Sequence, residues 1–249
     1  MARKRVSMTP MIAELLSEHG VFLSVRGNSI ENLSATPLVF DSGLEIEQGV
    51  GLYAGGELPN MGSFSYSQSP LPAGMKIGRY CSIGPGLKIE RGPAPVECFT
   101  TSNFTYERGG PVFQYAAKSM DLAGAGQGRP AWGRLPVIEH DVWIGSDVRL
   151  ARGVVLGTGS VILEGSTVRT SVAPYTVVAG DPARVVDSRF DPLTQGRLLR
   201  SKWWEIDPGV LASIRSAAPK DLLGVVAEQG KSRAAYRPKV LTAAQITAL

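Results

Sequence analysis

The chain has only two cysteines and two histidines among its 249 residues. Cys81 and Cys98 are too few for a disulfide framework, and they match no metal-ligand spacing. His19 and His140 are well separated, so they do not form the histidine cluster typical of a zinc site. These shortages predict a protein without disulfides and without a bound metal.

Long apolar runs and dense blocks of one charge are also missing. No apolar stretch approaches the roughly 18 residues that span a bilayer, and the basic start MARKRVSMTP lacks the following apolar segment of a secretory signal. We therefore expect a cytoplasmic protein without a membrane span. The net charge of +4 without a long Lys/Arg run argues against a nucleic-acid partner. It is compatible with an anionic ligand such as a phosphorylated cofactor.

A six-residue period is the strongest pattern in the chain. Every sixth residue from Ile138 is a branched aliphatic, and the residue four positions later is small or β-branched. The two sets are Ile138, Ile144, Leu150, Leu156, Ile162 and Val168, and Val142, Val148, Val154, Ser160, Ser166 and Val172. A helix needs a period near 3.6 and a single strand needs alternation. The period predicts an all-β parallel solenoid in which three short strands, and so three repeats, make one turn. The alternative fold is a β-sandwich, whose strands would have to match the six-residue period at six consecutive blocks by coincidence.

The same register occurs earlier and is then interrupted. Ile77, Ile83 and Ile89 repeat it, with Cys81 and Leu87 in the second set, and a looser series predicts the first coils. That looser series is Ile46, Leu52, Leu58 and Phe64. Between Ile89 and Ile138 the period is absent, and this long interval includes GPAPVECFTTSNFTY. A long excursion from a rigid scaffold is usually functional, so we expect the site to include this loop.

Helix signals lie at both ends of the chain. Thr9-Pro10 predicts a short capped helix ending near Gly20, and Asp191-Pro192 and Asp207-Pro208 predict helices that would cover the open end of the solenoid. The tail from Lys231 is weakly patterned, and we expect it to be mobile or to pack on a neighbouring subunit. The predicted organisation is a lead-in with a helix (1–43), a solenoid (44–186) with an inserted loop (92–136), and a helical C-terminal segment with a tail (187–249).

Several motifs occur in the order known from one protein family. DVWIGSDV, APYTVVAGDPARVV and RF…LLRSKWWEIDP, together with IGRYCSIGPGLKI followed by TTSNFTY, resemble the hexapeptide-repeat acyltransferases. The similarity is to the xenobiotic and polysaccharide O-acetyltransferase branch, over roughly residues 44–215. The resemblance implies a left-handed parallel β-helix, a homotrimer with sites between subunits, and acetyl-CoA as donor.

The resemblance also suggests cofactor contacts. Ser146 and Glu164 are three repeats apart and should stack on successive turns, where relatives contact the pantetheine arm. Trp143 braces the coil against the loop in the family, although plain packing explains it equally well.

Three further positions correspond to the nucleotide end of the cofactor. Arg169 and Thr170 occupy the place of a Thr-Lys pair, and Arg184 matches a basic residue that meets phosphates. A guanidinium suits phosphate because it donates in pairs. A solvated surface charge is the alternative for Arg184.

The proton acceptor is missing. Relatives carry a His-Pro-x-Asp run before Thr-Thr-Ser-x-Phe, and here that run is Ala94-Pro95-Val96-Glu97, so alanine stands in the histidine slot. A histidine base typically contributes about 10²–10⁴-fold to the rate. His140 and Glu97 are the candidates that could replace this base. For His140, a structural role as a turn residue is the favoured interpretation. Cys98 lacks a neighbouring base.

Four interpretations remain open. The enzyme acylates an amine that binds already neutral, or it uses His140, or it is a relative that binds acyl-CoA or a glycan without efficient turnover, or Ala94 is an engineered replacement of histidine. The main hypothesis is acyl transfer from acyl-CoA to a saccharide-like acceptor. Loop residues Ser102, Phe104 and Tyr106 are candidates for acceptor contacts, with anchoring of the loop as the alternative for the aromatics.

Overall fold

The fold is taken from a computed structural model of the whole chain. It describes residues 2–29, 33, 37–92, 96, 99–102, 110–119, 133–214, 218–229 and 235–249. Two compact units are present, one formed by Met1–Ile89 with Leu135–Leu249 and the other by Glu90–Arg134. In the smaller unit the described residues include helix α2 (Pro111–Ser119), on which Tyr115 is exposed.

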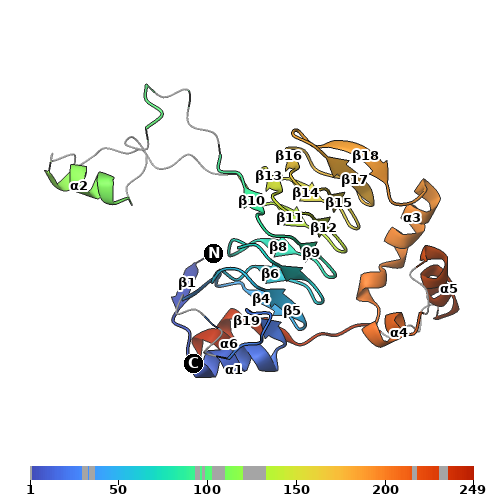
Figure 1. Cartoon of the computed structure of the whole chain (residues 1–249). Helices are drawn as coiled ribbons and strands as arrows, with labels where there is room; N and C mark the ends of the chain where they lie inside the picture. The colour runs from blue at the N-terminus through green and yellow to red at the C-terminus, as the bar shows by residue number, and fades with distance from the viewer. Residues whose placement is uncertain are drawn as a thin grey trace. The chain divides into compact units, whose positions relative to one another are not determined.

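The larger unit is built from short strands stacked in three sheets (Figure 1). The first sheet contains β4 (Glu45–Glu47), β6 (Asn60–Met61), β8 (Lys76–Ile77), β11 (Val137–Ile138), β14 (Val155–Leu156) and β19 (Val240–Thr242). The second contains β2 (Val21–Phe22), β5 (Val50–Leu52), β7 (Tyr66–Ser67), β9 (Ser82–Ile83), β12 (Trp143–Ile144), β15 (Val161–Ile162), β17 (Thr176–Ala179) and β18 (Arg184–Ser188). The third contains β10 (Lys88–Ile89), β13 (Arg149–Leu150) and β16 (Thr167–Val168). Within the three sheets, neighbouring strands are parallel except where β18 pairs with β17 and β19 pairs with β4.

The strand register confirms the predicted turn of three repeats in the later coils. Val137 pairs with Val155, Trp143 with Val161 and Arg149 with Thr167, one pair in each sheet. The six aliphatics at the first position of each block are at most 1% exposed, and all six residues of the second set are buried. Each turn therefore buries its apolar edge against the next, which an isolated turn could not do.

The first coils are shorter than predicted, and the prediction for Phe64 is wrong. Ile46 pairs with Met61 and Met61 with Ile77, so each of these two turns closes before three full repeats have passed. Because the turn is short, Phe64 falls at a corner, where it has φ 62° and is 42% exposed. Ile46, Leu52 and Leu58 are buried as expected.

One edge of the stack has an unusual backbone. The corner between the first and second sheets, here called the first corner, has positive φ on six successive turns: at Gly49, Phe64, Tyr80, Asp141, Gly159 and Tyr175. Four of the six are not glycine, and bulky residues rarely adopt this conformation. Ring contacts hold three of them, since Phe64 stacks on Tyr80, Tyr80 packs on Trp203 and Tyr175 packs on Phe190.

Helices close the end of the stack formed by the first coils. Thr9 caps α1 (Pro10–Glu18) by accepting from the Ile12 amide, and Ile12 and Leu16 join the core. The second cover is α6 (Ala243–Thr247), which buries Ile246. Nearby, β1 (Arg3–Val6) pairs antiparallel with β3 (Leu38–Asp41).

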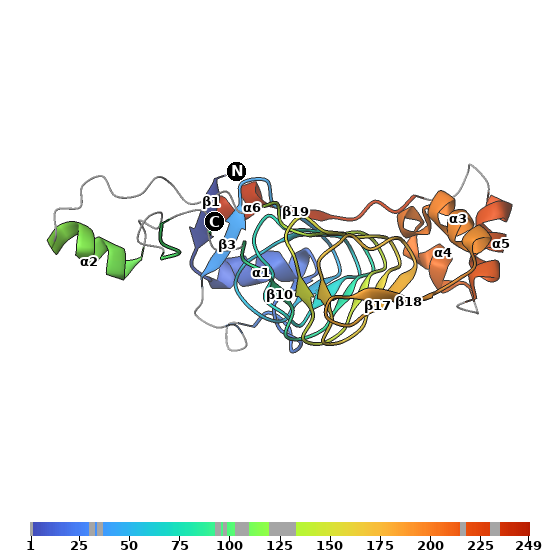
Figure 2. The ribbon, with the colours of Figure 1, turned by 90° about the horizontal axis from the view of Figure 1, so that it is seen from above.

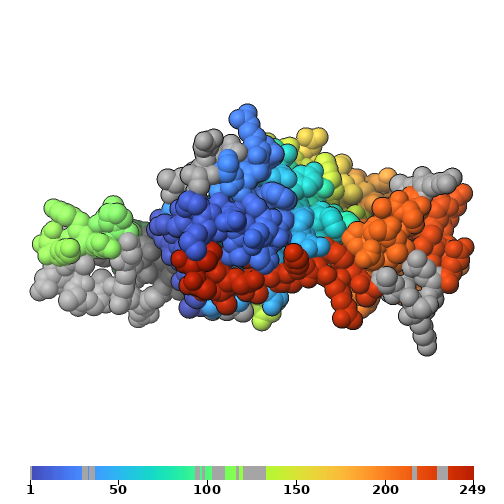
Figure 3. Space-filling view, turned by 90° about the horizontal axis from the view of Figure 1, so that it is seen from below, coloured from blue at the N-terminus to red at the C-terminus, as the bar shows by residue number. Residues whose placement is uncertain are grey.

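The C-terminal tail differs from the prediction. The tail was predicted to be mobile or to pack on a neighbouring subunit. Its described residues 235–249 instead pack on the first coils of the same chain. Figure 3 shows this segment, in red, running across the N-terminal residues in blue. The physical reason is burial of Leu241 and Ile246, both 0% exposed, against the otherwise open end of the stack.

The predicted Asp-Pro helix starts are both present. Asp191 caps α3 (Pro192–Ser201) and Asp207 caps α4 (Pro208–Ala212). A 3₁₀ turn (Trp203–Glu205) joins them, and α5 (Pro219–Gln229) contacts α3. These helices lie to one side of the coils rather than over the end (Figures 1 and 2). No helix among the described residues is long and apolar enough to cross a membrane.

Candidate functional site

Ser146 and Glu164 stack at the corner between the second and third sheets, here called the second corner. Ser146 follows β12 and Glu164 follows β15, and the amide of Gly165 donates to the Ser146 carbonyl at 2.9 Å. The predicted stacking of these two positions is confirmed. Gly145 permits the close approach, because a Cβ there would lie 2.7 Å from the Glu164 nitrogen.

Two arginines follow Glu164, one on the same turn and one after the segment that is hydrogen-bonded to that turn. Thr167 donates its amide to the Gly180 carbonyl at 2.9 Å and accepts at its own carbonyl from the Ala183 amide at 2.8 Å. Arg169 lies shortly after Thr167, and Arg184 directly follows Ala183 at the start of β18. Both side chains are exposed, and Arg169 reaches Asp181 at 3.9 Å.

Trp143 and Thr170 lie on the outside of the coils. Trp143 is on the outer surface of the second sheet and is 42% exposed, so burial in the core does not account for this indole. Thr170 is exposed just after β16 in the third sheet. Both can reach a ligand.

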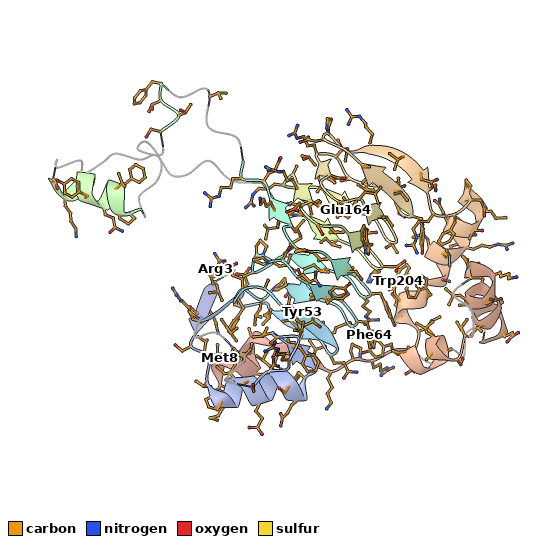
Figure 4. All side chains as sticks on the ribbon, in the orientation of Figure 1. Arg3, Met8, Tyr53, Phe64, Glu164 and Trp204 are labelled. Atoms are coloured by element: carbon orange, nitrogen blue, oxygen red, sulfur yellow. The ribbon has the colours of Figure 1, made fainter. Side chains whose placement is uncertain are left out.

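His140 lies at the first corner, at the opposite end of β12 from Ser146. Its ring stacks on Trp204 with centroids 4.8 Å apart and planes inclined by 12°, and Nδ1 accepts the Arg79 amide at 3.1 Å. Burial lowers the pKa of His140, and the charge of Arg79 lowers it further. The structure therefore brings His140 together with Trp204 and Arg79, and not with Ser146 and Glu164. Figure 4 labels Glu164 on the coils and Trp204 beside them, toward the C-terminal helices.

The first corner also holds an ion pair that the sequence analysis missed. Arg79 donates from Nε and Nη2 to the two carboxylate oxygens of Glu47, each at 2.7 Å, and from Nη1 to the Trp204 carbonyl at 3.0 Å. Burial alone would raise the pKa of Glu47, but the hydrogen bond from Arg79 and the one from the Ser63 amide outweigh it and lower the pKa. No local signal links these residues, because 32 positions separate Arg79 from Glu47.

The loop positions are only partly described. Ala94, Glu97, Phe104 and Tyr106 lie outside the described residues, as does Cys98. Ser102 is exposed and donates its amide to the Thr100 hydroxyl at 3.1 Å.

The remaining cysteine is not a nucleophile. Cys81 is fully buried, and burial raises the pKa of its thiol to about 12, so the reactive thiolate is not populated near neutral pH. Within the part of the chain that the structure describes, no group of three or more His, Cys, Asp or Glu side chains is arranged to hold a metal ion.

Comparisons with known proteins show what this chain is similar to. No family model matches it. It is 35% identical over 132 residues to a chloramphenicol acetyltransferase of Agrobacterium fabrum, covering 51% of this chain and 58% of that protein. It is 34% identical over 146 residues to a chloramphenicol acetyltransferase of Klebsiella aerogenes, covering 57% and 63%. The chain thus spans less than two thirds of the length of these two relatives.

Among solved structures, a hexapeptide-repeat-containing acetyltransferase from Vibrio cholerae is similar at 26% identity, with a TM-score of 0.35 and coverage of 53% of this chain and 63% of that one. A probable macrolide acetyltransferase of Lysinibacillus sphaericus is 31% identical over 135 residues, which cover 51% of this chain and 67% of that protein. With the repeat and the motifs in the expected order, this similarity shows that the chain belongs to the hexapeptide-repeat acyltransferase family.

Proposed function

We propose that this protein transfers an acetyl group from acetyl-CoA to a hydroxyl or amino group of a small acceptor. The observation that carries the proposal is the second corner, where Ser146 and Glu164 stack on successive turns. Exposed Trp143 lies on the adjoining sheet. Arg169 follows β16 on the same turn as Glu164, and Arg184 begins β18.

The chemistry of this corner fits an extended thioester donor. A pantetheine arm carries amide groups along its length, and a corner repeated at every turn offers backbone partners at a matching series of positions. Arg184 and Arg169 are cations that suit the phosphates at the other end, because a guanidinium donates to phosphate oxygens in pairs. Thr170 would assist at that end, and Trp143 would pack beside the arm.

In the reaction, the acceptor oxygen or nitrogen attacks the thioester carbonyl carbon. The new C–O or C–N bond forms, the C–S bond breaks, and the acceptor's proton finally protonates the departing sulfur of CoA. His140 is poorly suited to take that proton, because its Nδ1 already accepts a backbone amide and its ring is stacked. We therefore propose that Glu97 takes the proton, or that the acceptor is an amine that binds neutral.

The relatives' names guide the choice of acceptor. Chloramphenicol and macrolides are the compounds named for the relatives, and the resemblance adds saccharides, so hydroxyl-bearing compounds of these kinds are our proposed acceptors. Ser102, Phe104 and Tyr106 are the proposed acceptor contacts.

We further propose that the coils wind as a left-handed parallel β-helix. Its limits would be residues 44–186, with the loop at 92–136, a lead-in at 1–43 and the C-terminal segment at 187–249. Three such chains would assemble with the sites in the clefts between them. The proposed donor, acetyl-CoA, is compatible with a cytoplasmic location.

A specific observation favours a second candidate, a protein that binds acyl-CoA with little turnover. Ala94 stands where relatives have the histidine base, and loss of such a base typically costs about 10²–10⁴-fold in rate.

One experiment separates the two candidates. Release of free CoA thiol from acetyl-CoA is measured with chloramphenicol, a macrolide, maltose and glucosamine, for the wild type, Ala94→His and Glu97→Gln. Turnover by the wild type that is lost in Glu97→Gln would support the proposed enzyme. Turnover only in Ala94→His would support the binding protein, and no acetyl-CoA binding by any variant in calorimetry would refute both.

A further inference from the structure

The outer face of the second sheet carries two exposed aromatic residues with a small residue between them. Tyr66 on β7 pairs with Ser82 on β9, and Ser82 pairs with Trp143 on β12, so the three form one column across successive turns. Tyr66 is 38% exposed and Trp143 is 42% exposed, whereas Ser82 is half-buried. The two aromatic residues are therefore separated only by the short side chain of Ser82.

The spacing of this column suits a flat ring. Neighbouring strands lie about 4.8 Å apart, so the backbones of Tyr66 and Trp143 are separated by about 10 Å. A ring placed over Ser82 would be about 5 Å from each aromatic residue, within the 4.5–7 Å typical of ring pairs. One aromatic group therefore fits between the two.

The side of the column that faces the second corner has no side chains on two turns. Gly84 follows Ser82 along β9 toward that corner, and Gly145 follows Trp143 along β12. A Cβ on Gly84 would lie 3.0 Å from the carbonyl carbon of Gly145, so the turns approach closely here. On these two turns, no side chain separates the column from the second corner.

The proposed acetyl-CoA points toward the same column. Its phosphates are assigned to Arg169 and Arg184 on the later turns, and its arm runs back past Glu164 and Ser146. An arm that continues in this direction reaches the turn of Ser82, because β9 precedes β12 in the stack. The acceptor must meet the thioester where the arm ends, and this places it beside the column.

The chemistry of the column favours an aromatic acceptor over a saccharide. Tyr66, Ser82 and Trp143 carry no charge, and the column offers few hydrogen-bonding groups. A saccharide brings many hydroxyl groups, and each one that is buried without a partner costs free energy. An aryl ring has no such cost and gains from contact with the two aromatic side chains.

We propose that the acceptor is an aryl alcohol whose aromatic ring lies over Ser82, between Tyr66 and Trp143. Its hydroxyl group then lies toward the second corner, where it meets the thioester. Tyr66 is thereby a specificity-determining residue. This inference rests on the proposed function, because the direction of the donor comes from it, and it selects one class among the acceptors considered there.

The probe for the test is chloramphenicol, an alcohol with a nitrophenyl ring. Calorimetry measures its dissociation constant for the full-length protein with saturating CoA, which lacks the acetyl group and so prevents turnover. Tyr66→Ala should bind it at least about fivefold more weakly than the wild type. The matched control is Phe22→Ala, which removes a ring of nearly equal exposure, 39%, from the same column two turns before Tyr66 and should leave binding unchanged.

Two further measurements complete the test. Ser82→Phe fills the space between the two aromatic residues, so it should abolish chloramphenicol binding while CoA still binds as in the wild type. Maltose should bind the wild type at least about tenfold more weakly than chloramphenicol, a difference of about 1.4 kcal/mol. If Ser82→Phe does not fold, Tyr66→Ala and maltose decide the test.

The outcomes separate this inference from the proposed function. A wild type that binds CoA but not chloramphenicol overturns the inference alone, as does Tyr66→Ala or Ser82→Phe with wild-type affinity for chloramphenicol. Maltose binding as tight as that of chloramphenicol also overturns it. A wild type that binds no CoA refutes the proposed function, and the inference fails with it.

Discussion

Arg79 and Glu47 join three successive turns of the first corner through one bidentate ion pair. Nε and Nη2 of Arg79 each lie 2.7 Å from a Glu47 oxygen, and the same carboxylate accepts the Ser63 amide of the intervening turn at 2.9 Å. Gly62 leaves the space for this reach, because a Cβ there would come 2.7 Å from Cγ of Arg79. The pair therefore depends on the absence of a side chain on the turn between its partners.

Removing one partner should be costly. The two side chains are 14% and 22% exposed, so Arg79→Ala leaves a poorly solvated carboxylate, and we expect it to lower the free energy of unfolding by about 3 kcal/mol. Arg79→Lys should restore only part of that loss, since an ammonium cannot donate along two parallel directions. Urea unfolding measures both variants, and a loss below about 0.5 kcal/mol in Arg79→Ala would show that the pair is unimportant.

His140 should make stability depend on pH in the mildly acidic range. Burial and Arg79 lower its pKa in the folded state, so near pH 6 the unfolded chain binds the proton more readily. The stabilisation that comes from this pKa difference is fully present above pH 6.5, roughly the ordinary pKa of histidine. It is lost as the pH falls toward the pKa of His140 in the folded state.

His140→Asn provides the comparison, because the amide oxygen can still accept the Arg79 amide but does not titrate. The measurement is the free energy of unfolding from pH 8 to pH 5. The wild type should lose stability relative to the variant as pH falls, and parallel curves would contradict the lowered pKa.

The C-terminal tail should be structural. Leu241 in β19 is 0% exposed against the first coil, so Leu241→Ala should cost about 2–5 kcal/mol. Val240 precedes it in the same strand and is 37% exposed, so Val240→Ala should cost less than about 1 kcal/mol. Thermal unfolding compares the two, and equal costs would mean that the tail does not pack as described.

Gly145 should be irreplaceable at the second corner. In Gly145→Ala the new Cβ would lie 2.7 Å from the Glu164 nitrogen, so the turns must separate, at a cost of about 1–3 kcal/mol. Separated turns should also weaken acetyl-CoA binding, measured by calorimetry.

Gly224 in α5 supplies the control for Gly145. A Cβ there meets nothing within 4 Å, so Gly224→Ala should stabilise the protein by up to about 1 kcal/mol. If Gly145→Ala behaved like this control, close contact between the turns would not be needed for the site.

The inward positions from Ile138 to Val168 could be predicted from the sequence, because strand alternation and a turn of three repeats are set by local spacing. The stacking of Ser146 on Glu164 followed from the same spacing. Phe64 could not be placed in this way, because the lengths of the first turns depend on how neighbouring coils close on each other.

The surroundings of His140 could not be predicted from a local sequence pattern. Its neighbours are Arg79, far earlier in the chain, and Trp204, far later. Arg79 reaches His140 because β8 and β11 stack as successive coils, and Trp204 reaches it because the C-terminal segment returns along the first corner. The accepted amide is thus a product of coil stacking and the ring stack a product of that return, and together they turn a candidate base into a packed residue.

Four features could be read from the sequence: the repeat, the residues that face inward along it, the order of the family motifs, and the helix caps at Thr9, Asp191 and Asp207. Each of these rests on interactions within a few residues or on a strict period. Other features emerge only in the folded chain: the segment that closes the open end, the partners that surround His140, and the two aromatic residues on either side of Ser82. These features depend on contacts between distant segments, whose free energy comes from burying surface that no local pattern specifies.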